Sequence, residues 1–89
     1  MPAAKKKRVN FALHAPEASQ VSVAGTFNDW DPAARPMKRD KNGVWRTWMA
    51  LPSGEYQYLF VVDSAWRDDP ACPQRVPNPY GSHNCVLCV

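Results

Sequence analysis

Turn-forming residues interrupt this chain so often that an ordinary helix has no room. The 89 residues include nine prolines and four glycines. No window longer than about ten residues avoids them, or a polar turn cluster, while keeping an apolar period of 3.6 residues. Helix signals are therefore nearly absent, and the chain is expected to fold through short strands.

Strand signals recur at a spacing of about ten residues. Apolar and polar residues alternate over 9–13 and 21–24, and β-forming residues fill 44–51, 55–62 and 84–89. Asn42-Gly43 predicts a hairpin turn, whereas the four prolines of 68–79 predict an ordered surface loop. Six to eight short strands predict an all-β fold, an immunoglobulin-like antiparallel β-sandwich, with an open barrel as the alternative.

Length and charge indicate one domain behind a short tail. Residues 9–89 are assigned to the domain and residues 1–8 to a basic, disordered N-terminal tail. The net charge is +3, but the tail holds four of the eleven basic residues and none of the eight acidic ones. The rest of the chain is close to neutral, which is no electrostatic footprint for nucleic acid. Only the basic run Lys5–Arg8 keeps a nucleic-acid partner open as an alternative.

Neither a membrane span nor an export signal is predicted. No apolar run approaches the roughly 20 residues that cross a bilayer, and the N-terminus lacks the apolar stretch of a secretory signal. The three cysteines, Cys72, Cys85 and Cys88, cannot all pair within one chain, which agrees with a reducing compartment. A cytoplasmic protein with no membrane partner is expected.

Catalysis and metal binding are not predicted. His14 and His83 are the two histidines, and neither a nucleophile elbow nor a phosphate-binding glycine loop occurs, so the chain is expected not to be an enzyme. Cys72, His83, Cys85 and Cys88 supply the ligand types of a zinc site. However, the odd spacing of Cys85 and Cys88 places their side chains on opposite faces of a strand. We predict free thiols, no metal and no cofactor.

The four tryptophans are the strongest candidates for binding. Trp45 and Trp48 lie beside apolar residues in a predicted strand, so packing in the core or between sheets is expected for both. Trp30 and Trp66 lie among polar turn residues, where a large ring is difficult to bury. An exposed binding role and a loop-anchoring role are both open for these two.

Three segments, taken in order, resemble a known family. They are Val21–Trp30, Gly54–Asp63, and Trp66 followed by Asp68 and Pro70. Together they resemble carbohydrate-binding module family 48, which includes the glycogen-binding domain of the AMP-activated protein kinase β subunit and the N-terminal domains of isoamylases and branching enzymes. The resemblance covers residues 9–89. It implies a non-catalytic β-sandwich that binds α-1,4-glucans such as glycogen, starch or maltooligosaccharides.

The resemblance also implies a site for the sugar. By position, Trp30 and Trp66 correspond to two indole platforms. Tyr80, Ser82 and Asn84 correspond to a loop that meets the sugar with an apolar residue, a hydroxyl and an amide. These groups suit a pyranose, whose C–H faces are apolar and whose rim carries hydroxyls.

One position departs from the kinase-type site, because Leu59 stands where that site carries a lysine on its central strand. Side chains of the strand 55–62 alternate between two faces. The more aromatic face, with Tyr56, Tyr58 and Phe60, is expected to line the core. Leu59 is then expected to point into solvent on the sugar-binding surface.

Isoamylase-type relatives of the family supply a second interpretation. In many of them the same fold is a structural or protein-interaction domain that binds no sugar. The expected partners are therefore an α-glucan and, beside it, a glycogen-metabolising enzyme or kinase.

Overall fold

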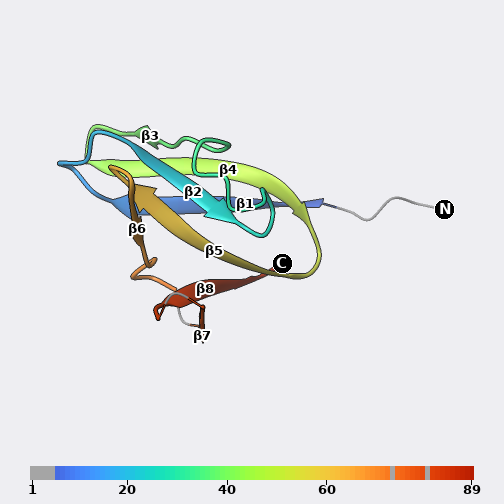
Figure 1. Cartoon of the computed structure of the whole chain (residues 1–89). Helices are drawn as coiled ribbons and strands as arrows, with labels where there is room; N and C mark the ends of the chain where they lie inside the picture. The colour runs from blue at the N-terminus through green and yellow to red at the C-terminus, as the bar shows by residue number, and fades with distance from the viewer. Residues whose placement is uncertain (1–5, 73, 80) are drawn as a thin grey trace.

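In the computed structural model, residues 6–72, 74–79 and 81–89 are described, and they form two antiparallel sheets (Figure 1). One sheet has the order β1 (Lys6–His14), β4 (Val44–Pro52), β3 (Lys38–Arg39). The other has the order β2 (Val21–Gly25), β5 (Glu55–Val62), β8 (His83–Cys88), β7 (Arg75–Pro77), with β6 (Ala65–Arg67) also paired to β5. The predicted all-β sandwich is confirmed.

The two sheets enclose one apolar core. Alternate side chains of β1 and β4 face alternate side chains of β2 and β5 across it. Tyr58 of β5 makes edge contacts with Phe11 at 5.2 Å and with Phe60 at 5.9 Å between ring centroids. Phe60 is completely buried and Tyr56 packs against the same cluster, so the expected core face of β5 is confirmed.

The first strand begins earlier than expected. Lys6, Lys7 and Arg8, assigned to a disordered tail from their charge, pair with Pro52, Leu51 and Ala50 at the end of β4. The reason is that β4 extends beyond the apolar part of β1, and its backbone offers ladder hydrogen bonds regardless of the side chains opposite. Residues 1–5 of that tail lie outside the described residues.

The hairpin between β3 and β4 occurs where Asn42-Gly43 predicts it. Gly43 has φ +78°, and the Asp40 carboxylate accepts hydrogen bonds from the N–H groups of Asn42 and Val44 and from Arg46 Nε. The N–H of Val44 and the Arg46 side chain are the main causes that hold the pKa of Asp40 below its usual value. Charged and backbone groups thus close this turn together.

The proline-rich segment is not entirely a loop. Arg75, Val76 and Pro77 form the short strand β7, which pairs with β8 at the edge of its sheet. An edge position suits proline, because a missing N–H then interrupts no central ladder.

Among the described residues we find no helical segment with the length and apolar character that a membrane crossing requires.

The three cysteines differ sharply in exposure. Cys85 of β8 is completely buried, Cys72 is buried beside it, and Cys88 is exposed. Burial raises the pKa of the Cys85 thiol to about 11. Cys85 Sγ also accepts a hydrogen bond from the N–H of Asp69 at 3.3 Å.

We expect the Cys85 thiol to make stability fall with pH in the alkaline range. Its pKa is higher in the folded protein than the ordinary 9.0, so the folded state holds this proton more tightly. The contribution is fully present below about pH 9 and is lost as pH rises through about 11. Urea unfolding at pH 8 to 10 should show the decline in the wild type and a weaker one in Cys85→Ala. An equal slope in Cys85→Ala and Cys88→Ala would contradict the assignment.

Candidate carbohydrate-binding site

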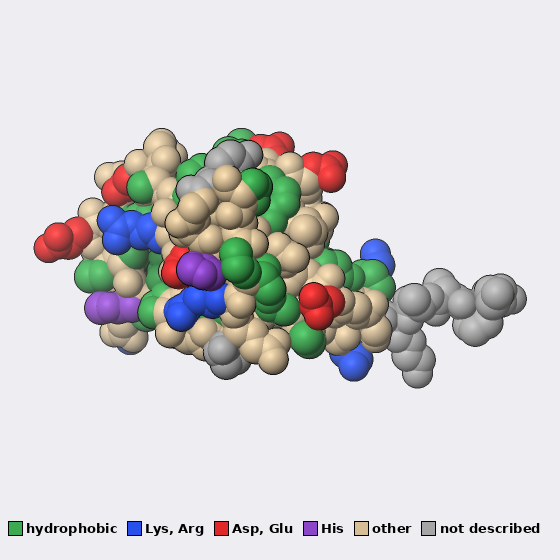
Figure 2. All heavy atoms as spheres, turned by 60° about the horizontal axis from the view of Figure 1, so that its bottom comes forward, with side chains coloured by type: hydrophobic (Ala, Val, Ile, Leu, Met, Phe, Trp, Pro, Cys, Tyr) green, Lys and Arg blue, Asp and Glu red, His purple; other side chains and the backbone are tan. Residues whose placement is uncertain are grey.

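A groove of about 740 Å³ lies on the outer face of the sheet that contains β5. Aromatic, aliphatic, amide and hydroxyl groups share its walls: Thr26, Trp30, Gln57, Leu59, Trp66, Asp68, Asn78, Pro79, Ser82 and Asn84. In the space-filling view, which brings the lower side of Figure 1 forward, hydrophobic side chains reach the surface between polar ones (Figure 2). The groove therefore combines flat apolar surface with hydrogen-bonding groups.

The loop after β2 carries Trp30 to the groove. Asn28 holds this loop in place: its Oδ1 accepts from the N–H of Gly25 at 3.0 Å, and its Nδ2 donates to the Val23 carbonyl at 3.1 Å. The N–H of Trp30 donates to the Gly25 carbonyl at 2.9 Å. Asp29 and Trp30 take left-handed φ values of 56° and 59°, which cost roughly 1–2 kcal/mol each for residues with a Cβ. The Asn28 side chain offsets that cost.

A tight hairpin carries Trp66 to the same groove. Asp63 and Ser64 take φ values of +48° and +71° between β5 and β6, as a two-residue hairpin turn requires. The Asp63 carboxylate accepts from the N–H groups of Ser19 and Gln20 at 2.8 and 2.9 Å, which fixes the turn against the start of β2. Trp66, opposite Val61, is 48% exposed.

The two indoles lie together. The ring centroids of Trp30 and Trp66 are 6.4 Å apart and their planes are inclined by 53°. Trp30 is half-buried, whereas about half of the Trp66 side chain faces solvent. Two rings from segments 36 positions apart in the sequence thus form one angled apolar wall.

Side-chain amides line the opposite part of the groove. Asn84 Nδ2 donates to Gln57 Oε1 at 3.1 Å, and Asn84 Oδ1 accepts from Asn78 Nδ2 at 3.0 Å. Asn78 Oδ1 also accepts from the N–H of Ser82 at 3.1 Å. The two bonds of Asn84 use one N–H and one lone pair, and a primary amide has two of each. Asn84 is therefore held in one orientation with capacity for a ligand.

Leu59 forms part of the groove but is not exposed to solvent. The two-residue period correctly places it on the outer face of β5, yet only 7% of its surface is accessible. The expectation that it points into solvent was wrong. Residues that are distant in sequence surround it, because Trp30 of the loop after β2 and Trp66 of β6, the strand paired beside β5, line the same groove.

All of the site residues suggested by the sequence that the structure describes lie in one groove. Trp30, Leu59, Trp66, Ser82 and Asn84 all line the groove. Tyr80 lies outside the described residues. Thr26, Asp68, Asn78 and Pro79 also line the groove and were not expected there, because their contribution depends on how the loops fold. Asn78 and Asn84, six residues apart and both amides, were the available signal.

The other two tryptophans, Trp45 and Trp48, differ in burial. Trp45 is in the core, as predicted, and its Nε1 donates to the Ala15 carbonyl at 2.8 Å. Trp48 is 51% exposed, so the packing role predicted for it was wrong. Both lie on β4, and an odd separation of three residues puts their side chains on opposite faces of a strand. That parity was readable from the sequence.

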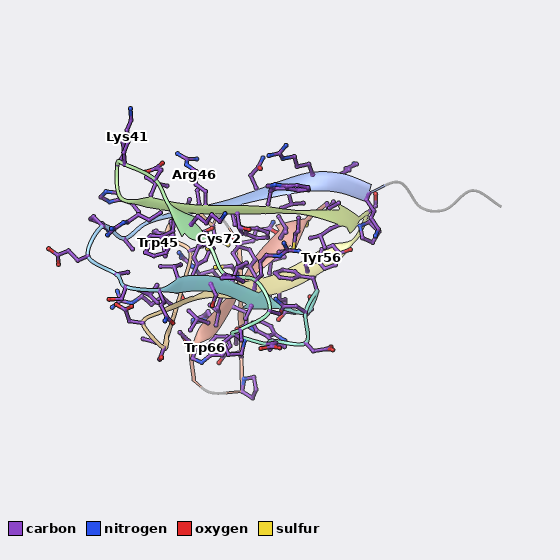
Figure 3. All side chains as sticks on the ribbon, turned by 90° about the horizontal axis from the view of Figure 1, so that it is seen from above. Lys41, Trp45, Arg46, Tyr56, Trp66 and Cys72 are labelled. Atoms are coloured by element: carbon purple, nitrogen blue, oxygen red, sulfur yellow. The ribbon has the colours of Figure 1, made fainter. Side chains whose placement is uncertain are left out.

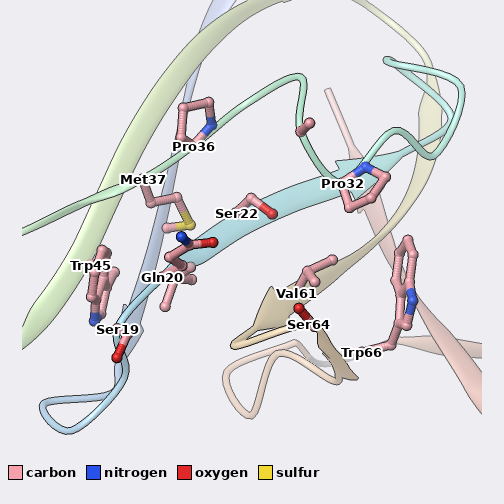
Figure 4. A pocket seen from close by; sticks show the side chains of 12 residues that line it. Ser19, Gln20, Ser22, Pro32, Pro36, Met37, Trp45, Val61, Ser64 and Trp66 are labelled. Atoms are coloured by element: carbon pink, nitrogen blue, oxygen red, sulfur yellow. The ribbon is translucent and has the colours of Figure 1, made fainter.

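A second groove of about 590 Å³ lies beyond Trp66. Figure 4 shows Trp66 at one end of it and Trp45 at the other, with Ser22 and Val61 between them. It lacks the amide cluster of the first groove. The first groove is therefore the better candidate for a ligand with many hydroxyls.

The part of the chain that the structure describes contains no group of three or more His, Cys, Asp or Glu side chains placed to hold a metal ion. Cys85 is buried and Cys88 exposed on the same strand, as their odd spacing predicts. The groove itself is lined by aromatic and aliphatic surface and by hydrogen-bonding amide and hydroxyl groups.

A sugar ring needs a flat apolar surface for its C–H faces and fixed polar groups for its rim, so the fold and the groove define a carbohydrate-binding module. Sequence comparison agrees with this class. Residues 9–89 match the family described as the glycogen recognition site of AMP-activated protein kinase, and the chain belongs to that family. It is accordingly a non-catalytic module of the kind that binds α-glucans.

Curated relatives come from plants and bacteria. "Protein PTST homolog 2, chloroplastic" of Arabidopsis thaliana is 39% identical over 70 residues, which cover 79% of this chain and 13% of that protein. "Protein FLOURY ENDOSPERM 6, chloroplastic" of Oryza sativa subsp. japonica is 36% identical over 72 residues, covering 81% of this chain and 13% of that protein. A "1,4-alpha-glucan branching enzyme GlgB 2" of Xanthomonas campestris is 39% identical over 58 residues, covering 61% of this chain and 8% of that protein. The chain thus spans a small part of each.

Proposed function

We propose that the groove between Trp30 and Asn84 binds α-1,4-linked glucans such as glycogen, starch and maltooligosaccharides. The observation that carries this proposal is the pair of indoles 6.4 Å apart beside a fixed amide. The angle of 53° between the rings suits a chain whose successive sugars turn relative to one another, as α-1,4 linkage makes them do.

Each wall of the groove contacts a different part of the sugar in this proposal. Trp66 and Trp30 cover the C–H faces of two sugars, while Asn84 and Ser82 exchange hydrogen bonds with hydroxyls on the rim. Leu59 forms an apolar floor beneath them. Because Asn84 is already oriented by Gln57 and Asn78, little conformational entropy is lost when the sugar binds.

Isothermal titration with maltoheptaose and β-cyclodextrin tests the proposal. Dissociation constants between about 1 μM and 1 mM are expected, or roughly −8 to −4 kcal/mol. Raising NaCl from about 50 to 500 mM should change the affinity less than about twofold, since a neutral sugar has no charge to be screened. Cellohexaose, whose β-1,4 chain is flat, is the matched control. Failure to bind either α-glucan, or a tenfold loss in salt, would reject the proposal.

We propose that the module brings a glycogen-metabolising enzyme or kinase to the polymer, which the relationship to a branching enzyme supports. The competing role, a structural or protein-interaction domain without sugar binding, predicts unchanged migration in a native gel that contains glycogen. A cytoplasmic location stays a prediction, and two relatives are chloroplastic by name.

Leu59→Lys is expected to trade stability for affinity. At 7% exposure the ammonium must be drawn out between the indoles or lose its hydration, and about 1–3 kcal/mol of stability should be lost. In the folded fraction, the ammonium can donate to a glucose hydroxyl for about 0.5–1.5 kcal/mol, tightening binding roughly 2- to 10-fold. Urea unfolding and titration measure both effects. Leu59→Met, which keeps an apolar floor, should change stability and glucan affinity little. If the lysine variant folds but binds no more tightly, the sugar does not lie over Leu59.

A further inference from the structure

The outer face of the β1–β4–β3 sheet carries an exposed tryptophan with an arginine stacked on it. Trp48 is 51% exposed and lies opposite Asn10 in the ladder. The guanidinium carbon of Arg8 lies 4.7 Å from the centroid of the Trp48 ring. This pair is on the sheet that does not form the sugar groove.

Charge is divided between the two sheets. The segments 6–14 and 38–52, which form the sheet of β1, β3 and β4, hold seven lysines and arginines and one acidic residue, Asp40. The segments 21–31 and 55–89, which form the other sheet and its loops, hold two arginines and six acidic residues. Figure 3 shows Lys41 and Arg46 pointing away from the molecule on the side opposite Trp66. The near-neutral domain is therefore electrically polar.

Register places four of these cations on the same outer face of the sheet as Trp48. Lys6, Arg8 and Arg46 alternate with inward-facing residues on β1 and β4, and Lys38 lies directly opposite Arg46. Asp40 forms an ion pair with Arg46 at 3.1 Å, and that pair is well exposed to solvent. We name these five residues, Lys6, Arg8, Lys38, Arg46 and Trp48, the basic sheet face.

We propose that the basic sheet face docks an acidic polypeptide segment in which aspartate or glutamate flanks an apolar side chain that covers Trp48. Tryptophan and arginine are enriched at protein–protein hot spots. Charged residues around such a hot spot orient the partner and increase its rate of association. An acidic protein complements every member of the face: carboxylates for the four cations and an apolar group for the exposed ring.

A nucleic acid fits the same face less well. Binding of a single strand uses several aromatic side chains on which successive bases stack. Among the described residues, Trp48 is the one large hydrophobic side chain exposed on this face.

The location has a functional consequence that does not depend on whether sugar binds. The basic sheet face and the groove of Trp30 and Trp66 lie on opposite outer surfaces of the sandwich. An acidic protein on one surface leaves the other accessible. The module would then hold its partner and a second ligand at the same time without competition.

Fluorescence anisotropy with a synthetic peptide tests the inference on the whole chain. The probe is a labelled peptide of about twelve residues with glutamates on both sides of one leucine, at about 50 mM NaCl. We expect a dissociation constant of about 10–100 μM, and at least a tenfold loss when salt rises to about 500 mM or when glutamine replaces every glutamate. Trp48→Ala should weaken binding about tenfold or more.

Two matched pairs of variants localise the effect. Trp66→Ala removes an equally exposed tryptophan from the other sheet and should leave peptide affinity unchanged. Arg8→Gln and Lys7→Gln remove the same charge from neighbouring residues whose side chains point to opposite faces. Only Arg8→Gln should weaken binding more than about threefold, and it tests the face even if Trp48→Ala fails to fold.

Three results would overturn the inference. One is no binding of the glutamate peptide by the wild type up to about 1 mM. Another is equal affinity in Arg8→Gln and Lys7→Gln. The third is binding of an oligothymidylate of similar charge at least as tight as that of the peptide, which would assign the face to nucleic acid.

Discussion

Alanine in place of Trp66 is expected to weaken maltoheptaose binding by about 1–3 kcal/mol, a factor of roughly 5 to 150, while the protein stays folded. About half of this side chain already faces solvent, so truncation leaves a small cavity at most. What is lost is apolar area that would be covered by a sugar. Titration calorimetry on the variant, after its circular dichroism has been compared with the wild type, measures the effect.

Trp30→Ala should weaken binding by a similar amount with a different side effect. Trp30 is half-buried and its backbone has a φ of 59°, so alanine also removes packing that stabilises the loop. Trp48→Ala is the matched control for Trp66→Ala, because Trp48 is 51% exposed and lies on the opposite sheet. Unchanged affinity in folded Trp30→Ala and Trp66→Ala proteins would remove both indoles from the site.

Gly25→Ala is expected to have the largest effect on stability. A Cβ at Gly25 would lie 2.3 Å from the Gln57 carbonyl oxygen and 2.9 Å from Tyr58 Cβ on the neighbouring strand. Because these atoms belong to β5, relief requires the strands to separate where Thr26 and Gln57 are hydrogen-bonded. We expect a loss of about 2–4 kcal/mol and a melting temperature lower by at least about 10 °C.

Glucan binding should fall with stability in Gly25→Ala, since the Gly25 carbonyl accepts the N–H groups of Asn28 and Trp30 and so holds the loop. Gly81→Ala provides the comparison. Gly81 has φ +79° but nothing within 4 Å of its hypothetical Cβ, so backbone strain alone should cost about 1 kcal/mol. Thermal unfolding of both proteins checks the difference. Equal melting temperatures would show that β2 and β5 adapt more easily than their contact indicates.

Most of the strand pattern was predictable because it depends on neighbouring residues. The alternation in 55–62 correctly assigns Tyr58 and Phe60 to the core and Leu59 to the other face. Turn chemistry likewise locates the hairpin at Gly43, where a positive φ is needed. The same parity, applied to β4, separates Trp45 from Trp48, although apolar neighbours had suggested packing for both.

The composition of the groove was less predictable because it depends on loops. Trp30, Trp66 and Asn84 were indicated by resemblance, and the structure brings them to one surface. Asn78 lies in a proline-rich segment that offers no periodic signal, yet it orients Asn84. The one sign of this role in the sequence is that two amide side chains lie six residues apart.

The amino-acid sequence by itself determined where most of the strands and turns lie and which face the side chains of β4 and β5 take, because these depend on spacing along the chain. Only the tertiary structure decided what covers each face. Leu59 is buried in a groove that it shares with Trp30 and Trp66, and no local pattern in the sequence predicts that arrangement. The separation of charge between the two sheets is also decided by the tertiary structure. The fold places β1, β3 and β4 in one sheet and β2, β5 and β8 in the other, and a net charge summed along the chain does not contain that information.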